Sequence, residues 1–128
     1  MKSKSKKTIK KILLAEDEQI LNRIFSSRLE EEGFKVERVF DGGEALAKLS
    51  TQSFDLLLLD LLMPVMGGIE VLTELKARKN KIPVIVLTNL SSGKDPHAAM
   101  ALGAKAWFIK SDMTTDDLVQ IVKKHIGR

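Results

Sequence analysis

Polar side chains stand at the ends of four short apolar runs. Glu16 and Asp17 follow residues 12–15, Asp60 closes the run FDLLLLD, Thr88 follows residues 82–87, and Lys110 follows residues 104–109. The carboxylate of Asp60, which has leucines on both sides, would be costly to bury without a partner. Carboxylates within hydrogen-bonding range repel one another, and at least one pKa rises unless a cation is present.

These residue types suit one kind of chemistry. Oxygen ligands without a neighbouring histidine or cysteine favour a hard cation such as Mg²⁺ or Mn²⁺. A carboxylate beside such an ion and a lysine can attack phosphorus and carry the phosphoryl group as an acyl phosphate. The residues can cooperate only if the fold brings the ends of the runs together.

The apolar runs have the composition of buried strands. Each is too short for a helix and is rich in residues that suit a strand buried on both faces. The runs are 12–15, 54–59, 82–87 and 104–109. A weaker run, 34–40, carries several charged side chains, as is typical of a strand at the edge of a sheet.

Helical patterns lie between the runs. The first, over residues 19–32, places Ile20, Ile24, Phe25 and Leu29 on a shared side. Further helices are expected over 43–49, 68–77, 95–102 and 114–126, and Asp95-Pro96 has the sequence of a helix start.

The order βαβαβαβαβα predicts an α/β fold, a (βα)5 doubly wound parallel sheet with helices on both faces and right-handed crossovers. In such sheets polar chemistry gathers beyond the carboxyl ends of the strands. The polar residues named above are all expected at that rim, where carboxylates, a hydroxyl and a lysine would face one another.

Four segments in this order resemble the response-regulator receiver domain of two-component signalling. They are ILLAEDE, DLLLLDLLMPVMGG, PVIVLT and GAKAWFIKS. The resemblance runs from about residue 9 to residue 126, and the receiver domain is expected over residues 9–128. It implies a flavodoxin-like, five-stranded sheet with strand order 2-1-3-4-5. It also implies a switch in a phosphorelay, which accepts a phosphoryl group from a histidine kinase or a phosphotransfer protein.

The resemblance assigns roles to individual residues. Asp60 would be the phosphoacceptor, and Lys110 and Thr88 would contact the phosphoryl oxygens. Mg²⁺, with Mn²⁺ as a possible substitute, would be held by Glu16, Asp17, Asp60 and the backbone carbonyl of Leu62. Trp107 would take the position of the aromatic switch residue, and the alternative is an inert packing or surface role.

Three positions depart from the usual pattern of the family. Glu16 stands where aspartate is more common, so its carboxylate would reach the ion directly or through water. Ser111 replaces the proline that usually follows the lysine through a cis peptide, which leaves open whether the Lys110–Ser111 bond is cis or trans. The tryptophan at position 107 is larger than the usual tyrosine or phenylalanine.

Phosphorylation is expected to act on the face formed by residues 95–102, 104–110 and 114–126. The added charge would draw Thr88 inward and vacate space into which Trp107 could turn. A downstream protein would bind this face, and the domain would be a monomer or a phosphorylation-dependent dimer. Leucines at positions 62 and 90 replace polar side chains that would place a water, so slow self-dephosphorylation is expected rather than enzymatic turnover.

Composition excludes several classes of protein. The chain of 128 residues has the length of one domain, with 44% hydrophobic and 30% charged residues. It has no cysteine for a disulfide or a thiolate zinc site, and no apolar stretch of the roughly 18 residues that a membrane span needs. Because a secretory signal is also absent, a cytoplasmic location without membrane contact is expected.

The net charge of +4 derives from the N-terminal segment. Six lysines and no acid lie within residues 1–11, and subtracting these six from 21 basic residues leaves 15 against 17 acidic residues, a net charge of −2 for the rest. Residues 1–8 are therefore expected to be a disordered basic tail, and the domain itself is not expected to bind DNA directly.

Three other functions compete with the switch. A Mg²⁺-dependent phosphohydrolase with an aspartyl nucleophile would usually carry a second aspartate at the position of Leu62. A pseudo-receiver that binds partners without phosphorylation would be favoured by loss of Asp60 or Lys110, and both are present. Nucleotide binding is disfavoured because the turn after residues 12–15 is acidic rather than glycine-rich. His97 and His125 are far apart in the sequence and have no companion residues for a metal site, so both are expected to be surface residues.

Overall fold

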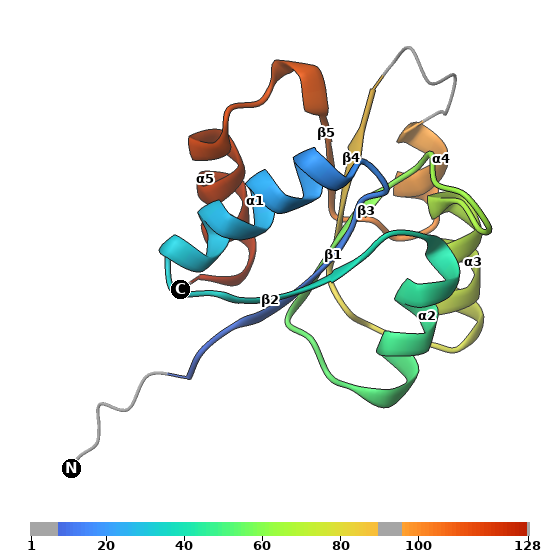
Figure 1. Cartoon of the computed structure of the whole chain (residues 1–128). Helices are drawn as coiled ribbons and strands as arrows, with labels where there is room; N and C mark the ends of the chain where they lie inside the picture. Colours follow the sequence, from blue (N-terminus) through green and yellow to red (C-terminus); the bar gives the residue numbers. More distant parts are fainter. Residues whose placement is uncertain (1–7, 90–95, 128) are drawn as a thin grey trace.

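In the computed structural model, which describes residues 8–89 and 96–127, a sheet lies between two layers of helices (Figure 1). Helices α1 and α5 cover one face, and α2, α3 and α4 cover the other (Figure 1). Of the predicted tail 1–8, only Thr8 belongs to the described residues, and Leu90 and Asp95 lie outside them as well.

The elements follow one another in the predicted alternation. The strands are β1 (Lys11–Ala15), β2 (Lys35–Val39), β3 (Leu56–Asp60), β4 (Val84–Thr88) and β5 (Ala106–Ile109). The helices are α1 (Gln19–Glu31), α2 (Gly42–Thr51), α3 (Gly68–Ala77), α4 (Pro96–Ala101) and α5 (Thr115–Ile126), with a 3₁₀ turn, η3 (Lys110–Asp112), before α5.

All strand pairs are parallel, and the order across the sheet is β2-β1-β3-β4-β5. The α/β class, the (βα)5 order, the flavodoxin-like strand order 2-1-3-4-5 and the helices on both faces are thus confirmed. The strand order reverses between β1 and β3, which are neighbours in the sheet. In open α/β sheets this is where the carboxyl ends of the strands form a crevice for ligands.

Alternate residues of the central strands belong to two separate cores. Leu13 and Leu57 pack toward α2, α3 and α4, whereas Ile12 and Leu56 pack toward α1 and α5. Because side chains alternate across a strand, a run of apolar residues supplies both faces at once. This explains why the runs in the sequence are continuous rather than alternating.

Two expectations about burial are wrong. The run 104–109 contains β5 at the second edge of the sheet, and the four residues of this strand are only half-buried. In α1, Ile20 and Ile24 are 76% and 46% exposed, and the buried face instead carries Phe25 and Leu29 together with two polar residues. Compared with the prediction, α1 is rotated about its axis. The polar Asn22 takes a core position, where its NH₂ group donates to two backbone carbonyls.

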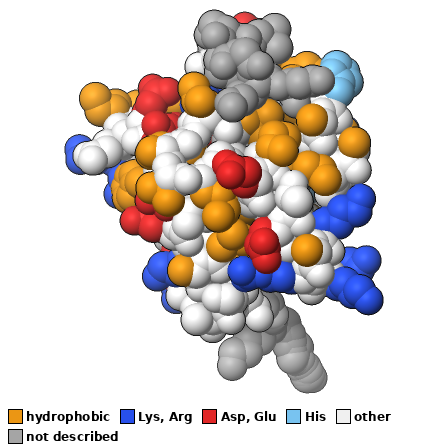
Figure 2. Space-filling view, turned by 90° about the vertical axis from the view of Figure 1, so that its right-hand side faces the viewer, with side chains coloured by type: hydrophobic (Ala, Val, Ile, Leu, Met, Phe, Trp, Pro, Cys, Tyr) orange, Lys and Arg blue, Asp and Glu red, His pale blue; other side chains and the backbone are white. Residues whose placement is uncertain are grey.

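The face formed by α3 and α4 is chemically mixed. Figure 2 shows acidic and basic side chains interspersed with hydrophobic ones across this side of the molecule. None of the described helices combines the length and apolarity that crossing a membrane requires.

Candidate functional site

The predicted acids meet beyond the carboxyl ends of β1 and β3. These strands are direct neighbours, and Ala15 pairs with Leu59, so the residues after β1 lie beside Asp60. One oxygen from each of Glu16, Asp17 and Asp60 lies within 4.8 Å of the others. Such a set of carboxylate oxygens fits a hard divalent cation like Mg²⁺.

Lys110 enters the same group from the end of β5. Its Nζ lies 2.8 Å from Glu16 Oε1 and 3.0 Å from Asp60 Oδ2, and only 9% of the residue is exposed. One ammonium therefore serves two buried carboxylates. A third acid, Glu18, has an exposed side chain, and its Oε2 lies 3.5 Å from the same ammonium.

Burial and crowding shift the pKa values of this group. Burial raises the pKa of Glu16 to about 7, and the charge of Asp60 adds to this effect while Lys110 opposes it. Burial also raises the pKa of Asp60, although Lys110 works in the opposite direction. Burial alone would lower the pKa of Lys110, but its bonds to Glu16 and Asp60 raise it above the ordinary value, so the ammonium stays charged.

Backbone groups hold the acidic side chains in place. Asp60 Oδ1 accepts a hydrogen bond from Leu62 N at 3.2 Å, and Glu16 Oε2 accepts one from Glu18 N at 3.0 Å. The loop after Asp60 returns closely to it, because a Cβ on Gly68 would lie 2.6 Å from the Asp60 carbonyl oxygen. Only glycine allows α3 to begin against this part of β3.

A cavity of about 110 Å³ opens above the group. It is lined by Asp17, Glu18, Asp60, Leu62, Asn89 and Lys110. Glu18 and Asn89 are not among the predicted site residues. Glu18 continues the acidic triplet and could have been found from it, whereas Asn89 acts through its amide oxygen, which accepts a hydrogen bond from Ser111 N at 3.2 Å.

Neither Thr88 nor Trp107 lines this cavity. Thr88 is fully buried as the last residue of β4, and its Oγ1 donates to Asn89 O at 3.4 Å. Trp107 is half-buried and meets His97 edge-on, with ring centroids 5.9 Å apart. His97 is exposed, as predicted.

Two further expectations concern the turn after Lys110 and the second histidine. No peptide bond between described residues is cis, so the open question at Lys110–Ser111 is settled as trans. Lys110 nevertheless reaches both acids from the start of η3. His125, which was predicted to lie at the surface, is half-buried, and its Nδ1 lies 2.9 Å from Ile121 O.

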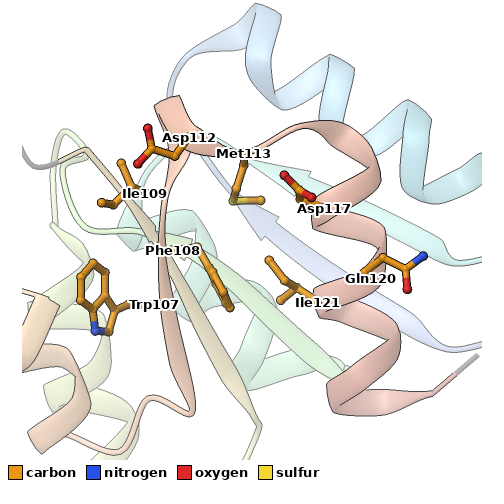
Figure 3. A pocket seen from close by; sticks show the side chains of 8 residues that line it. All are labelled: Trp107, Phe108, Ile109, Asp112, Met113, Asp117, Gln120 and Ile121. Atoms are coloured by element: carbon orange, nitrogen blue, oxygen red, sulfur yellow. The ribbon is translucent and has the colours of Figure 1, made fainter.

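A second hollow, of about 490 Å³, lies between β5 and α5. Its lining consists of Trp107, Phe108, Ile109, Asp112, Met113, Asp117, Gln120 and Ile121. Figure 3 shows Phe108, Met113 and Ile121 in the space between the strand and the helix, with Trp107 on the other side of the strand. This part of the surface combines an apolar floor with two acidic side chains.

Comparisons with known proteins agree with these features. Residues 12–123 match the model of the response regulator receiver domain. The chain is 43% identical over 94 residues to a transcriptional regulatory protein CpxR homolog of Haemophilus influenzae, an alignment that covers 73% of this chain and 40% of that protein. It spans about half the length, or less, of the transcriptional regulators that it matches.

Two solved structures have the same fold. A CheY-like receiver domain from Methanospirillum hungatei superposes with a TM-score of 0.85 at 28% identity, covering 93% of this chain and 94% of that one. The receiver domain of a sensor histidine kinase from Pseudomonas aeruginosa, solved with a magnesium ion coordinated in its active site cleft, gives a TM-score of 0.83 at 27% identity. That match covers 94% of this chain and 100% of the other.

Proposed function

The chain belongs to the response regulator receiver domain family of two-component signalling, and on that premise we propose that Asp60 is its phosphoacceptor. One observation carries the proposal: the carboxylate of Asp60 lies 3.0 Å from the Lys110 ammonium and beside the acids Glu16 and Asp17. A buried acid in this setting has a nucleophilic oxygen, a cation for the incoming charge and ligands for a divalent ion.

Mg²⁺ would be held by carboxylate oxygens of Glu16, Asp17 and Asp60 and by the Leu62 carbonyl. When bound, it would neutralise charge on the phosphoryl oxygens. An Asp60 oxygen forms the new bond to phosphorus while the bond from phosphorus to the donor breaks, and the donor atom keeps the electron pair. The ammonium of Lys110 compensates the negative charge on the transferred group. The phosphoryl oxygens then replace some of the contacts that Lys110 makes with Glu16 and Asp60 in the unphosphorylated protein.

The readout of the switch would start at Thr88. Its hydroxyl is bonded only weakly in the structure, at 3.4 Å, and can rotate toward new phosphoryl oxygens. Trp107 could then turn into the space behind it, changing the face made by α4, β5 and α5. The apolar hollow beside β5, with Asp112 and Asp117 at its rim, supports a downstream protein target on this face.

The partners follow from the same arrangement. A histidine kinase or a phosphotransfer protein would donate the phosphoryl group, and slow self-dephosphorylation would end the signal. Direct DNA binding by this domain is not proposed, since the mixed charges on the α3–α4 side give no basic groove there. We further propose a cytoplasmic location and either a monomer or a dimer that forms on phosphorylation.

A kinase-free assay tests the proposal. The protein is incubated with acetyl phosphate with and without Mg²⁺, and its intact mass is measured. We expect the mass to rise by one phosphate with Mg²⁺ and to stay unchanged in the Asp60→Asn variant. The control Asp116→Asn, which alters an exposed acid remote from the cavity, should be labelled like the wild type. Stable labelling of Asp60→Asn would refute the assignment, and rapid catalytic consumption of the donor would favour a phosphohydrolase.

A further inference from the structure

Asn22 is a polar residue that is fully buried on the core-facing side of α1. Its amide makes three hydrogen bonds. Nδ2 donates to the carbonyl oxygen of Glu16 at 2.8 Å and to that of Val39 at 3.2 Å, and Oδ1 accepts from Arg38 Nε at 2.6 Å. The side chain thus joins the ends of β1 and β2 to the helix that follows the acidic triplet.

We propose that Asn22 is a positioning residue for the metal-binding acids, and that Arg38 orients it. The inference rests on the function proposed above and adds a determinant of its Mg²⁺ affinity. Neither residue touches the cavity itself. Asn22 acts on the backbone from which the ligands Glu16 and Asp17 extend.

The hydrogen bonds fix this backbone on both sides of Glu16. Its N–H donates to Val39 O at 3.2 Å, while its carbonyl oxygen accepts from Asn22. The carbonyl of Glu16 belongs to the peptide that connects it to Asp17, so the amide of Asn22 sets the plane of the link between the two acids. Outer contacts of this kind orient metal ligands and influence affinity without touching the ion.

Arg38 gives the amide a single direction. An asparagine amide can be turned by half a revolution, which exchanges its oxygen and its nitrogen. The guanidinium of Arg38 is a donor only, so it binds the oxygen and leaves the NH₂ group facing the two carbonyls. All donors and the acceptor of the amide are then used, as a buried polar group requires.

Ser26 provides a matched comparison for a merely structural role. It is also a buried polar residue on α1, one turn after Asn22, but its Oγ bonds to Arg23 O within the helix. A change at Ser26 can alter the packing of α1 without touching the backbone of the acids. Stability and ligand placement can therefore be separated experimentally.

The test measures Mg²⁺ binding by calorimetry and unfolding by urea for the wild type, Asn22→Ala, Ser26→Ala and Arg38→Ala. We expect Asn22→Ala to weaken Mg²⁺ binding by roughly tenfold, as replacements of outer contacts at metal sites do. Arg38→Ala should weaken it less, and Ser26→Ala should leave the dissociation constant unchanged even if it lowers stability.

Wild-type Mg²⁺ affinity in a folded Asn22→Ala protein would overturn this inference but not the function proposed above. If Asn22→Ala does not fold, Arg38→Ala decides, since Arg38 is exposed and its removal leaves the core intact. An unchanged dissociation constant in that variant would then overturn the inference. A wild-type protein that binds no Mg²⁺ would overturn the proposed site and this inference together.

Discussion

Glu16 and Lys110, 94 positions apart in the sequence, form a buried ion pair with 2.8 Å between Oε1 and Nζ. The same ammonium lies 3.0 Å from Asp60, so two carboxylates share one positive charge. The group is therefore short of positive charge, which a divalent cation would supply. The stability of the protein should depend on pH and on Mg²⁺ as a result.

Glu16→Gln should stabilise the metal-free protein at neutral and alkaline pH. The pKa of Glu16 is raised to about 7 in the fold, so the unfolded chain loses this proton first and stability falls as the pH rises from about 4.5 to 7. The neutral glutamine removes this fall. We expect a gain of roughly 1–3 kcal/mol at pH 8 and little difference near pH 4.5, since one unit of pKa corresponds to about 1.4 kcal/mol. Urea unfolding of the wild type and Glu16→Gln between pH 4.5 and 8 measures this difference. A difference in stability that does not change with pH would contradict the prediction.

Lys110→Met, unlike Glu16→Gln, should destabilise the metal-free protein. Removing one partner of a buried ion pair typically costs about 3–5 kcal/mol because the remaining charges are left without compensation. The loss should be greater at pH 8 than at pH 5, where Glu16 can take up a proton, and Mg²⁺ should restore part of it. Urea titrations with and without Mg²⁺ measure these differences. Lys48→Met, which removes a partly exposed ion pair with Glu37, should cost no more than about 1 kcal/mol.

The fold was predictable because the strand runs are long enough to supply two cores and are separated by clear helical patterns. The site was predictable because carboxyl ends of parallel strands share one rim, which brings Asp60 and Lys110 together. The rotation of α1 was not predictable from the sequence. Hydrophobicity alone placed Ile20 and Ile24 inside. The buried amide of Asn22 instead bonds to the carbonyls of Glu16, just after β1, and Val39 in β2, which no local sequence pattern reveals.

The exposed isoleucines of α1 lead to a prediction about the phosphodonor. Ile20 is 76% exposed and lies two residues after Glu18, which lines the cavity. A protein donor must bring its histidine to this cavity and would cover the apolar side chain. Ile20→Ser should slow phosphotransfer from a purified histidine kinase by roughly fivefold or more, the size of effect expected for a central interface residue.

Labelling by acetyl phosphate separates docking from chemistry. It should be unchanged in Ile20→Ser, because a small donor needs no contact with α1. Ile9→Ser is the matched control: it also changes an isoleucine that is mostly exposed, at 66%, but lies before β1 at the opposite end of the sheet. Equal losses in the two variants, or slower labelling by acetyl phosphate, would contradict a docking role for Ile20.

Leu62 should set the lifetime of the phosphorylated state. Its side chain lines the cavity, is 49% exposed and has no group that could hold a water in line with phosphorus. An asparagine at this position offers both a donor and an acceptor to such a water. Leu62→Asn should therefore lose its phosphate several times faster than the wild type after the donor is removed, as followed by intact mass.

Val65→Asn is the control, because Val65 is 85% exposed in the same loop and does not line the cavity. Its φ of 68° suits asparagine better than valine, so that variant should fold and keep the wild-type lifetime. An unchanged or longer lifetime in Leu62→Asn would show that access of water is limited elsewhere.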